Sequence, residues 1–116
     1  MSGKTLEMTL LFDFYGELLT EKQREYFDLY YNDDLSLGEI AEEMGITRQG
    51  VRDMIVRAEG TLRDTEDKLG LVRRFVEMRE TLESARAAAT ELRRMISGAA
   101  AAKCEELMGI LGDLKG

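Results

Sequence analysis

The stretch that decides the fold is SLGEIAEEMGITRQGV, which runs from Ser36 to Val51. It opens with a serine three residues before a glutamate, a capping box in which each side chain accepts a hydrogen bond from a free backbone N–H at the helix start. Gly45 follows the first helical run and tolerates the left-handed conformation at a helix end. Thr47 is a second cap, so the stretch predicts two helices joined by a tight turn, a helix-turn-helix.

Apolar side chains in and around this stretch predict how its two helices pack. Ala41 is small at the point where the helices must cross closely. The residues expected to form the shared core are Ile40, Met44, Ile46, Val51 and Met54.

The rest of the chain is also predicted to be helical, because it has no proline and is rich in Ala, Leu, Glu, Arg and Met. Thr20 and Gln23 form another capping box. These signals predict helices over residues 6–19, 20–31, 36–45 and 47–69, with a polar turn at 32–34. The fold class is therefore all-α, with a four-helix helix-turn-helix domain in residues 1–70.

Residues 71–116 carry a different pattern, with apolar positions alternately four and three apart. The first seam consists of Leu71, Phe75, Met78, Leu82, Ala85, Ala89, Leu92 and Ile96. After Gly98, a second seam consists of Ala100, Cys104, Leu107, Leu111 and Leu114. This heptad-type spacing predicts two helices that form an antiparallel hairpin.

The seams of the hairpin allow two interpretations. They could pack on each other and on the N-terminal domain, or the longer seam could bury against a second copy. A helix of ~26 residues spans ~39 Å, more than a short partner helix and a small domain readily cover. We therefore expect a homodimer, with the seam residues Leu71, Phe75, Met78, Leu82, Leu92 and Ile96 at its interface.

Composition limits the function. The chain has one cysteine, Cys104, and no histidine, so it cannot form an internal disulfide or the usual zinc ligand sets. We find no nucleophile–base constellation and no secretory or membrane-spanning segment in the sequence. The sequence thus predicts a cytoplasmic protein that is not an enzyme, needs no cofactor and does not associate with membranes.

Charge is distributed unevenly along the chain, whose formal net charge is −7. Residues 1–70 hold 16 acidic and 8 basic side chains, whereas residues 71–116 hold 7 and 8. Because DNA binding rests on neutralising phosphates with Lys and Arg, the acidic domain has the wrong sign for it.

The second helix of the helix-turn-helix nevertheless has residues that could touch nucleic acid. At ~100° per residue, Gln49, Arg52, Asp53 and Val56 face outward and Arg48 and Arg57 lie on the flanks. Gln49 and Arg52 would contact base edges, while Arg48 and Arg57 would hold phosphates. Such a strip suits RNA as well as DNA, and exposed arginines are also ordinary solubilising residues.

The segment from Leu18 to Leu71 resembles the bacterial YlxM family of helix-turn-helix proteins. The strings TEKQR, YYNDDLSLGEIAEE and TRQGV carry the resemblance, and the Ala-rich tail from about Glu83 does not share it. The domain is in turn similar to the last DNA-binding region of bacterial sigma factors, where the outward residues touch the promoter. The resemblance implies a small, all-helical, cytoplasmic regulatory partner of the signal recognition particle pathway.

Two functional hypotheses follow. The first is a regulatory protein that contacts the GTPase subunit of the signal recognition particle through acidic residues. Its candidate contacts are Asp33, Asp34, Glu39, Glu42 and Glu43, although each could equally be an ordinary solvated charge. The second is a sequence-specific transcription regulator, whose dimer would present two recognition helices ~34 Å apart.

Overall fold

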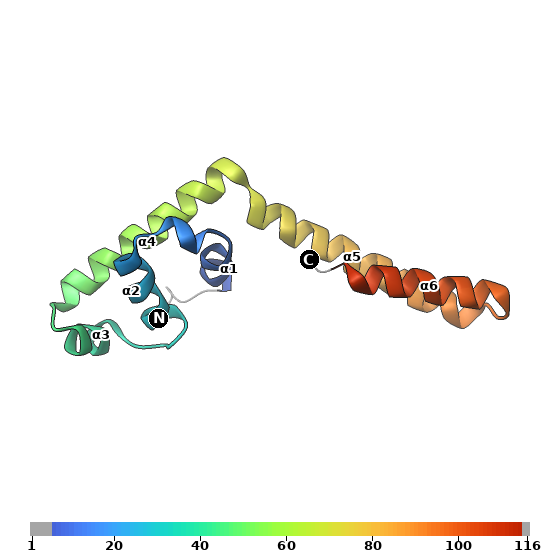
Figure 1. Cartoon of the computed structure of the whole chain (residues 1–116), viewed down its shortest axis with the longest axis horizontal. Coiled ribbons are helices and arrows are strands. Elements are labelled where there is room, and N and C mark those ends of the chain that lie inside the picture. The colour runs from blue at the N-terminus through green and yellow to red at the C-terminus, as the bar shows by residue number, and fades with distance from the viewer. Residues whose placement is uncertain (1–5, 115–116) are drawn as a thin grey trace. The chain divides into compact units, whose positions relative to one another are not determined.

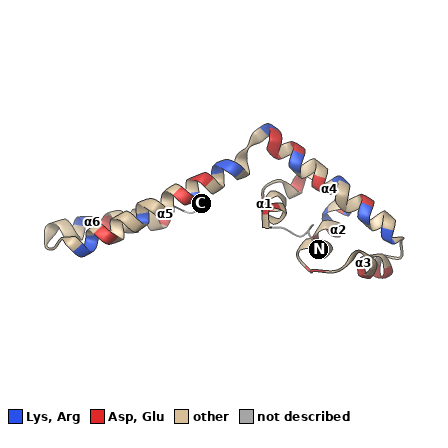
Figure 2. Ribbon diagram, turned by 180° about the vertical axis from the view of Figure 1, so that it is seen from behind, with Lys and Arg blue, Asp and Glu red and all other residues tan. Residues whose placement is uncertain are grey.

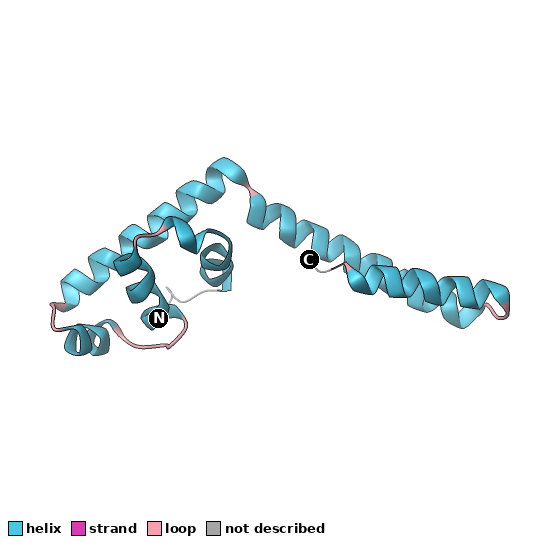
Figure 3. Cartoon of the chain, viewed as in Figure 1, coloured by secondary structure: helices cyan, strands magenta, loops and turns pink. Residues whose placement is uncertain are grey.

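The structure is a computed structural model that describes residues 6–114, and this part of the chain is helical with no strand (Figures 1 and 3). Its elements are α1 (Leu6–Tyr15), a 3-10 turn η1 (Gly16–Leu18), α2 (Glu21–Tyr31), α3 (Leu37–Met44), α4 (Arg48–Leu69), α5 (Leu71–Met95) and α6 (Ala99–Asp113). The predicted all-α helix-turn-helix fold is confirmed. The chain divides into two compact units, Met1–Val72 and Arg73–Gly116, which we call the helix-turn-helix unit and the hairpin unit.

Local capping fixes where the helices begin and end. The Thr20 hydroxyl accepts from the Gln23 N–H at 3.1 Å and the Gln23 side chain accepts from the Thr20 N–H at 3.0 Å. Ser36 and Glu39 form the second reciprocal pair, at 3.0 and 2.8 Å. Gly45 ends α3 with φ of 71°. Both predicted capping boxes and the left-handed glycine are confirmed.

The core of the helix-turn-helix unit is built on one apolar stripe of α4. Its buried residues are Val51, Ile55, Ala58 and Leu62. Val51 and Ile55 pack in one cluster with α2 and α3, and Ala58 and Leu62 pack in another with α1 and α2. Figure 1 shows α1, α2 and α3 gathered along the same side of α4. The stripe therefore serves both halves of the core.

Ile46 does not join this core, contrary to the sequence-based expectation, because it is 40% exposed. Its N–H bonds to the Ala41 carbonyl at 3.1 Å, which holds it in the turn after the left-handed Gly45. Its side chain lies over the first turn of α4, where its Cδ1 is 3.5 Å from the place that a Cβ on Gly50 would occupy.

Aromatic rings connect α1 to α2 and to α4. Phe27 stacks on Phe12 with ring centroids 4.6 Å apart and on Tyr31 at 4.3 Å. The Tyr31 hydroxyl donates to the Glu59 carboxylate of α4. Burial, and then this carboxylate, raise the pKa of Tyr31.

A second tyrosine holds the junction between α4 and α5. The Tyr15 hydroxyl donates to Glu66 Oε1 at 2.6 Å and accepts from the Leu71 N–H at 3.2 Å. Glu66 Oε1 also accepts from the Val72 N–H at 3.0 Å, so it caps the first turn of α5. Gly70 ends α4 in the left-handed conformation, with φ of 64°. Burial, and then the hydrogen bond to Glu66, raise the pKa of Tyr15.

Truncation of the α4 stripe should strongly destabilise the chain. Leu62 is fully buried, so Leu62→Ala should lower the free energy of unfolding by about 2–5 kcal/mol. Gly60→Ala is the matched control, because a Cβ at Gly60 meets no atom within 4 Å. It should not destabilise the chain, since alanine removes the helix penalty of glycine, about 1 kcal/mol. Urea unfolding curves would measure both, and equal destabilisation by the two changes would contradict this packing.

The two tyrosine–glutamate bonds predict a loss of stability in alkali. Because the pKa of Tyr15 is raised above 10.0 in the folded chain, the unfolded chain loses its proton first as the pH rises through that value. Stability should then fall with pH, by at most about 1.4 kcal/mol per pH unit for each such tyrosine. Tyr15→Phe should show a shallower fall in urea unfolding experiments between neutral and alkaline pH. Parallel pH curves for the wild type and Tyr15→Phe would rule out this contribution.

Candidate functional site

The candidate site is the outward face of α4 with the turn before it. The Thr47 hydroxyl caps α4 by accepting from the Gly50 N–H at 3.0 Å. Since the inward stripe of α4 is buried, the opposite stripe, ~180° away around the helix, is the face offered to a partner. Gln49, Asp53 and Val56 lie on it, and all three are exposed.

Gln49 and Asp53 bind each other across one turn of α4. The Gln49 side-chain amide donates to Asp53 Oδ1 at 3.0 Å. A glutamine that reads adenine uses its amide donor and its carbonyl acceptor together, and here the donor is bonded to a carboxylate. That carboxylate would also face DNA phosphates. The centre of the face is therefore poorly suited to reading bases.

The arginines of α4 lie at the edges of this face, and they include Arg52, which was expected to face outward. Arg48 and Arg52 are exposed and one turn apart, and Arg63 falls on the same flank three turns further on. Arg57, nine residues after Arg48, lies on the other flank, about two and a half turns along. The four arginines thus do not form one ridge, and Glu59 interrupts the flank that three of them share.

Two apolar side chains also lie exposed around the turn. Val56 is 50% exposed on α4, and Ile46 is 40% exposed between α3 and α4. Sequence reasoning placed Ile46 in the core, because an apolar residue directly after a left-handed glycine commonly packs back on the helix that the glycine ends. Single exposed apolar side chains are normal on a protein surface, so these two do not by themselves mark a binding site.

The five predicted acidic contacts are all exposed and come from α3 and the turn before it. Figure 2 shows acidic residues on α3. The structure gives two of them a local role: the Glu39 carboxylate caps α3, and Asp34 takes a left-handed backbone with φ of 57°. Asp33 lies beside it in the turn, and Glu42 and Glu43 are surface carboxylates near the end of α3. Glu42 and Glu43 are therefore the best pair to test for partner binding.

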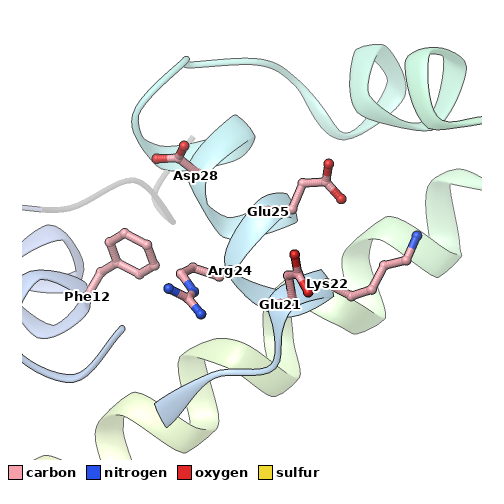
Figure 4. A pocket seen from close by; sticks show the side chains of 6 residues that line it. All are labelled: Phe12, Glu21, Lys22, Arg24, Glu25 and Asp28. Atoms are coloured by element: carbon pink, nitrogen blue, oxygen red, sulfur yellow. The ribbon is translucent and has the colours of Figure 1, made fainter. Parts of the chain in front are cut away.

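A shallow hollow of about 710 Å³ lies beside α1 and α2, away from the turn. It is lined by Phe12, Glu21, Lys22, Arg24, Glu25 and Asp28 (Figure 4). Figure 4 shows Arg24 directed toward Phe12, while Glu25 and Asp28 point away from each other. The charges do not converge on one point, as a catalytic set would require.

Within residues 6–114, no group of three or more His, Cys, Asp or Glu side chains could hold a metal ion. No helix in the described part of the chain is long and apolar enough to cross a membrane.

Five of the six predicted dimer-seam residues lie on α5, and Ile96 directly follows its last residue. Leu71, Met78 and Leu92 are exposed, and Phe75, Leu82 and Ile96 are half-buried. None of the six is fully buried in the single chain.

Comparison with known proteins agrees with the helix-turn-helix. Residues 2–100 match the family described as "Putative helix-turn-helix protein, YlxM / p13 like". The chain belongs to this family. It is 47% identical over 114 residues to the UPF0122 protein of Halalkalibacterium halodurans, covering 98% of this chain and 96% of that one. It is 49% identical over 109 residues to the relative in Shouchella clausii, covering 93% and 94% of the two chains. A relative in Caldanaerobacter subterraneus is 55% identical over 83 residues, covering 72% and 71%.

The charge of the outward face predicts weak DNA binding. Proteins bind arbitrary duplexes with dissociation constants of about 10⁻⁴–10⁻⁶ M at physiological salt, and we expect this chain to bind more weakly. Asp53→Ala should raise the affinity roughly fivefold, because it removes a charge that phosphates repel, worth about 1 kcal/mol, and releases the Gln49 amide. Fluorescence anisotropy of a labelled duplex measures the affinity of the wild type and of Asp53→Ala. Glu80→Ala, which removes the same charge on α5, is the control. Tight wild-type binding that Asp53→Ala weakens would contradict this account.

Proposed function

We propose that the chain is a non-enzymatic regulatory protein of the signal recognition particle pathway, acting in the cytoplasm by protein interaction through its helix-turn-helix unit. The observation that favours protein interaction over DNA binding is the Gln49–Asp53 hydrogen bond at the centre of the outward face of α4. At this position a DNA-reading helix needs donors that are available to the bases. Here there is a carboxylate, and the amide beside it already donates to that carboxylate. The choice of pathway rests on the resemblance of residues 18–71 to the YlxM family.

Charge supports a protein partner with a basic surface. The helix-turn-helix unit has eight more acidic than basic side chains, and a net negative unit is steered toward positive surfaces. The GTPase subunit of the signal recognition particle binds RNA and is expected to present such a surface. Glu42 and Glu43 would meet its basic side chains, and the exposed Val56 and Ile46 would supply apolar contact.

The second candidate function is sequence-specific binding of nucleic acid. Arg48 and Arg52 favour it, because they are exposed one turn apart at the start of α4, where a recognition helix contacts bases and phosphates. A dimer would then read two half-sites ~34 Å apart on DNA. The same two arginines could contact an RNA partner.

The test is isothermal titration calorimetry, in which the purified chain is titrated against the purified GTPase subunit and the dissociation constant is measured. We expect Glu42→Lys/Glu43→Lys to weaken binding at least about tenfold, since close interfacial charge pairs contribute more than about 1.4 kcal/mol. Glu80→Lys/Glu91→Lys makes the same change of charge on α5 and should leave the affinity nearly unchanged. Arg48→Glu/Arg52→Glu should still bind, with or without nuclease.

Two results would overturn the proposal. One is a wild-type chain that does not bind the GTPase subunit, or whose affinity for it is the same as that of Glu42→Lys/Glu43→Lys. The other is capture of DNA fragments, sensitive to deoxyribonuclease, from a lysate by the wild type and not by Arg48→Glu/Arg52→Glu. That result would make the chain a transcription regulator.

A further inference from the structure

The hairpin unit, Arg73–Gly116, has far more apolar surface than it buries. Its buried residues among those described are three small ones, Ala89, Ala101 and Cys104. The Cys104 thiol donates to the Ala89 carbonyl at 3.3 Å, which shows how closely α5 and α6 approach there. The exposed large apolar residues of the unit, with 38–75% of their surface accessible, are Val76, Met78, Leu92, Met95, Leu107, Ile110 and Leu114.

Most of these side chains line two hollows between α5 and α6. The first, near the turn, has a volume of about 630 Å³ and is lined mainly by Leu92, Ile96, Cys104, Leu107 and Ile110. The second has a volume of about 650 Å³ and is lined mainly by Met78, Leu82, Ala85, Leu111 and Leu114. Along each helix these residues recur three or four apart, so both hollows open on one side of the hairpin. We call them together the hairpin groove.

An isolated two-helix unit of this size lacks a sufficient core. Units near about 40 residues usually need a disulfide, a metal or association with another chain to be stable. Cys104 is the single cysteine, so an internal disulfide is impossible. The leucines and isoleucines that would form a core are in the hairpin groove, where a covering chain would bury them.

Charge indicates that the covering chain is a second copy. Residues 73–116 hold 8 basic and 7 acidic side chains, so two hairpin units can meet with little repulsion. Both signs also occur at the rim, as Arg74 and Glu77 at one hollow and Lys103 and Glu106 at the other. In a two-fold interface a patch meets its own copy, and a rim with both signs is complementary to itself.

The dimensions of the hairpin also suit a dimer. The 25 residues of α5 and the 15 of α6 are about 37 and 22 Å long, and a helix is about 10 Å wide. One side of the hairpin therefore offers on the order of 600 Å², close to the roughly 800 Å² per partner of a standard protein interface. The alternating four- and three-residue spacing is the pattern of helices that pack in bundles.

We propose that the hairpin groove binds the same groove of a second copy, so that α5 and α6 of two chains form a four-helix bundle. This dimer is independent of the proposed function of the helix-turn-helix unit. The leucine and isoleucine side chains of the groove form the bundle core, and the rim charges of the two chains meet around it. Lys103 and Glu106 pair with each other at 2.8 Å within each chain, and Arg74 and Glu77 are the rim residues that meet the other copy.

Sedimentation equilibrium of the full chain over a range of concentrations tests the proposal. The wild type should have about twice the chain mass of 13.1 kDa. Leu92→Glu/Leu107→Glu puts two charges into the groove and should raise the dimer dissociation constant at least about 100-fold. The control Val76→Glu/Ala87→Glu adds the same charge on the side of α5 away from the groove and should stay dimeric.

A separate measurement shows whether the helix-turn-helix unit stays folded in each variant. All four tyrosines lie in the helix-turn-helix unit, so their near-ultraviolet circular dichroism reports that unit and should not change. Leu92→Ala/Leu107→Ala, which buries no charge, should weaken the dimer by a smaller factor. A monomeric wild type, a dimeric Leu92→Glu/Leu107→Glu, or equal dissociation of groove and control variants would each overturn the proposal.

Discussion

The helix-turn-helix unit depends on a single apolar stripe of α4. Val51 and Ile55 close one cluster and Ala58 and Leu62 close the other, so α1, α2 and α3 share one surface on which to pack. This constraint also determines the candidate site. Because one side of α4 is committed to the core, the opposite side is exposed, and its residues form the candidate site.

The outward residues show why the shape of a helix-turn-helix does not settle its ligand. DNA recognition needs available donors on the exposed side of the second helix and a positive surface around them. Here the glutamine in the middle of that side donates to an aspartate 3.0 Å away, and acidic side chains outnumber basic ones two to one in residues 1–72. The exposed side chains of Val56 and Ile46 are apolar, which suits the proposed protein partner.

The sequence predicts well what depends on neighbouring residues and poorly what depends on distant ones. The caps at Thr20 and Ser36 and the glycine at 45 act within four residues, so their patterns located the helix ends. The bonds of Tyr15 join residues more than 50 positions apart, and no local pattern indicates them. The Gln49–Asp53 bond lay within reach of sequence reasoning, because side chains four apart on a helix are neighbours. Ile46 was misplaced because an apolar residue beside a turn can face the core or cover the helix start, and packing decides between them.

The two units differ in the physical origin of the contacts they can make. The helix-turn-helix unit is strongly negative, which disfavours contact with itself and with nucleic acid and favours a basic protein surface. The hairpin unit is nearly neutral and has an apolar groove, which favours a partner of the same composition. A second copy of the chain has that composition. Salt screens attraction between exposed charges but acts little on apolar burial. One short chain can thus hold two independent binding surfaces, because neither the charge of the first nor the groove of the second is required by the other.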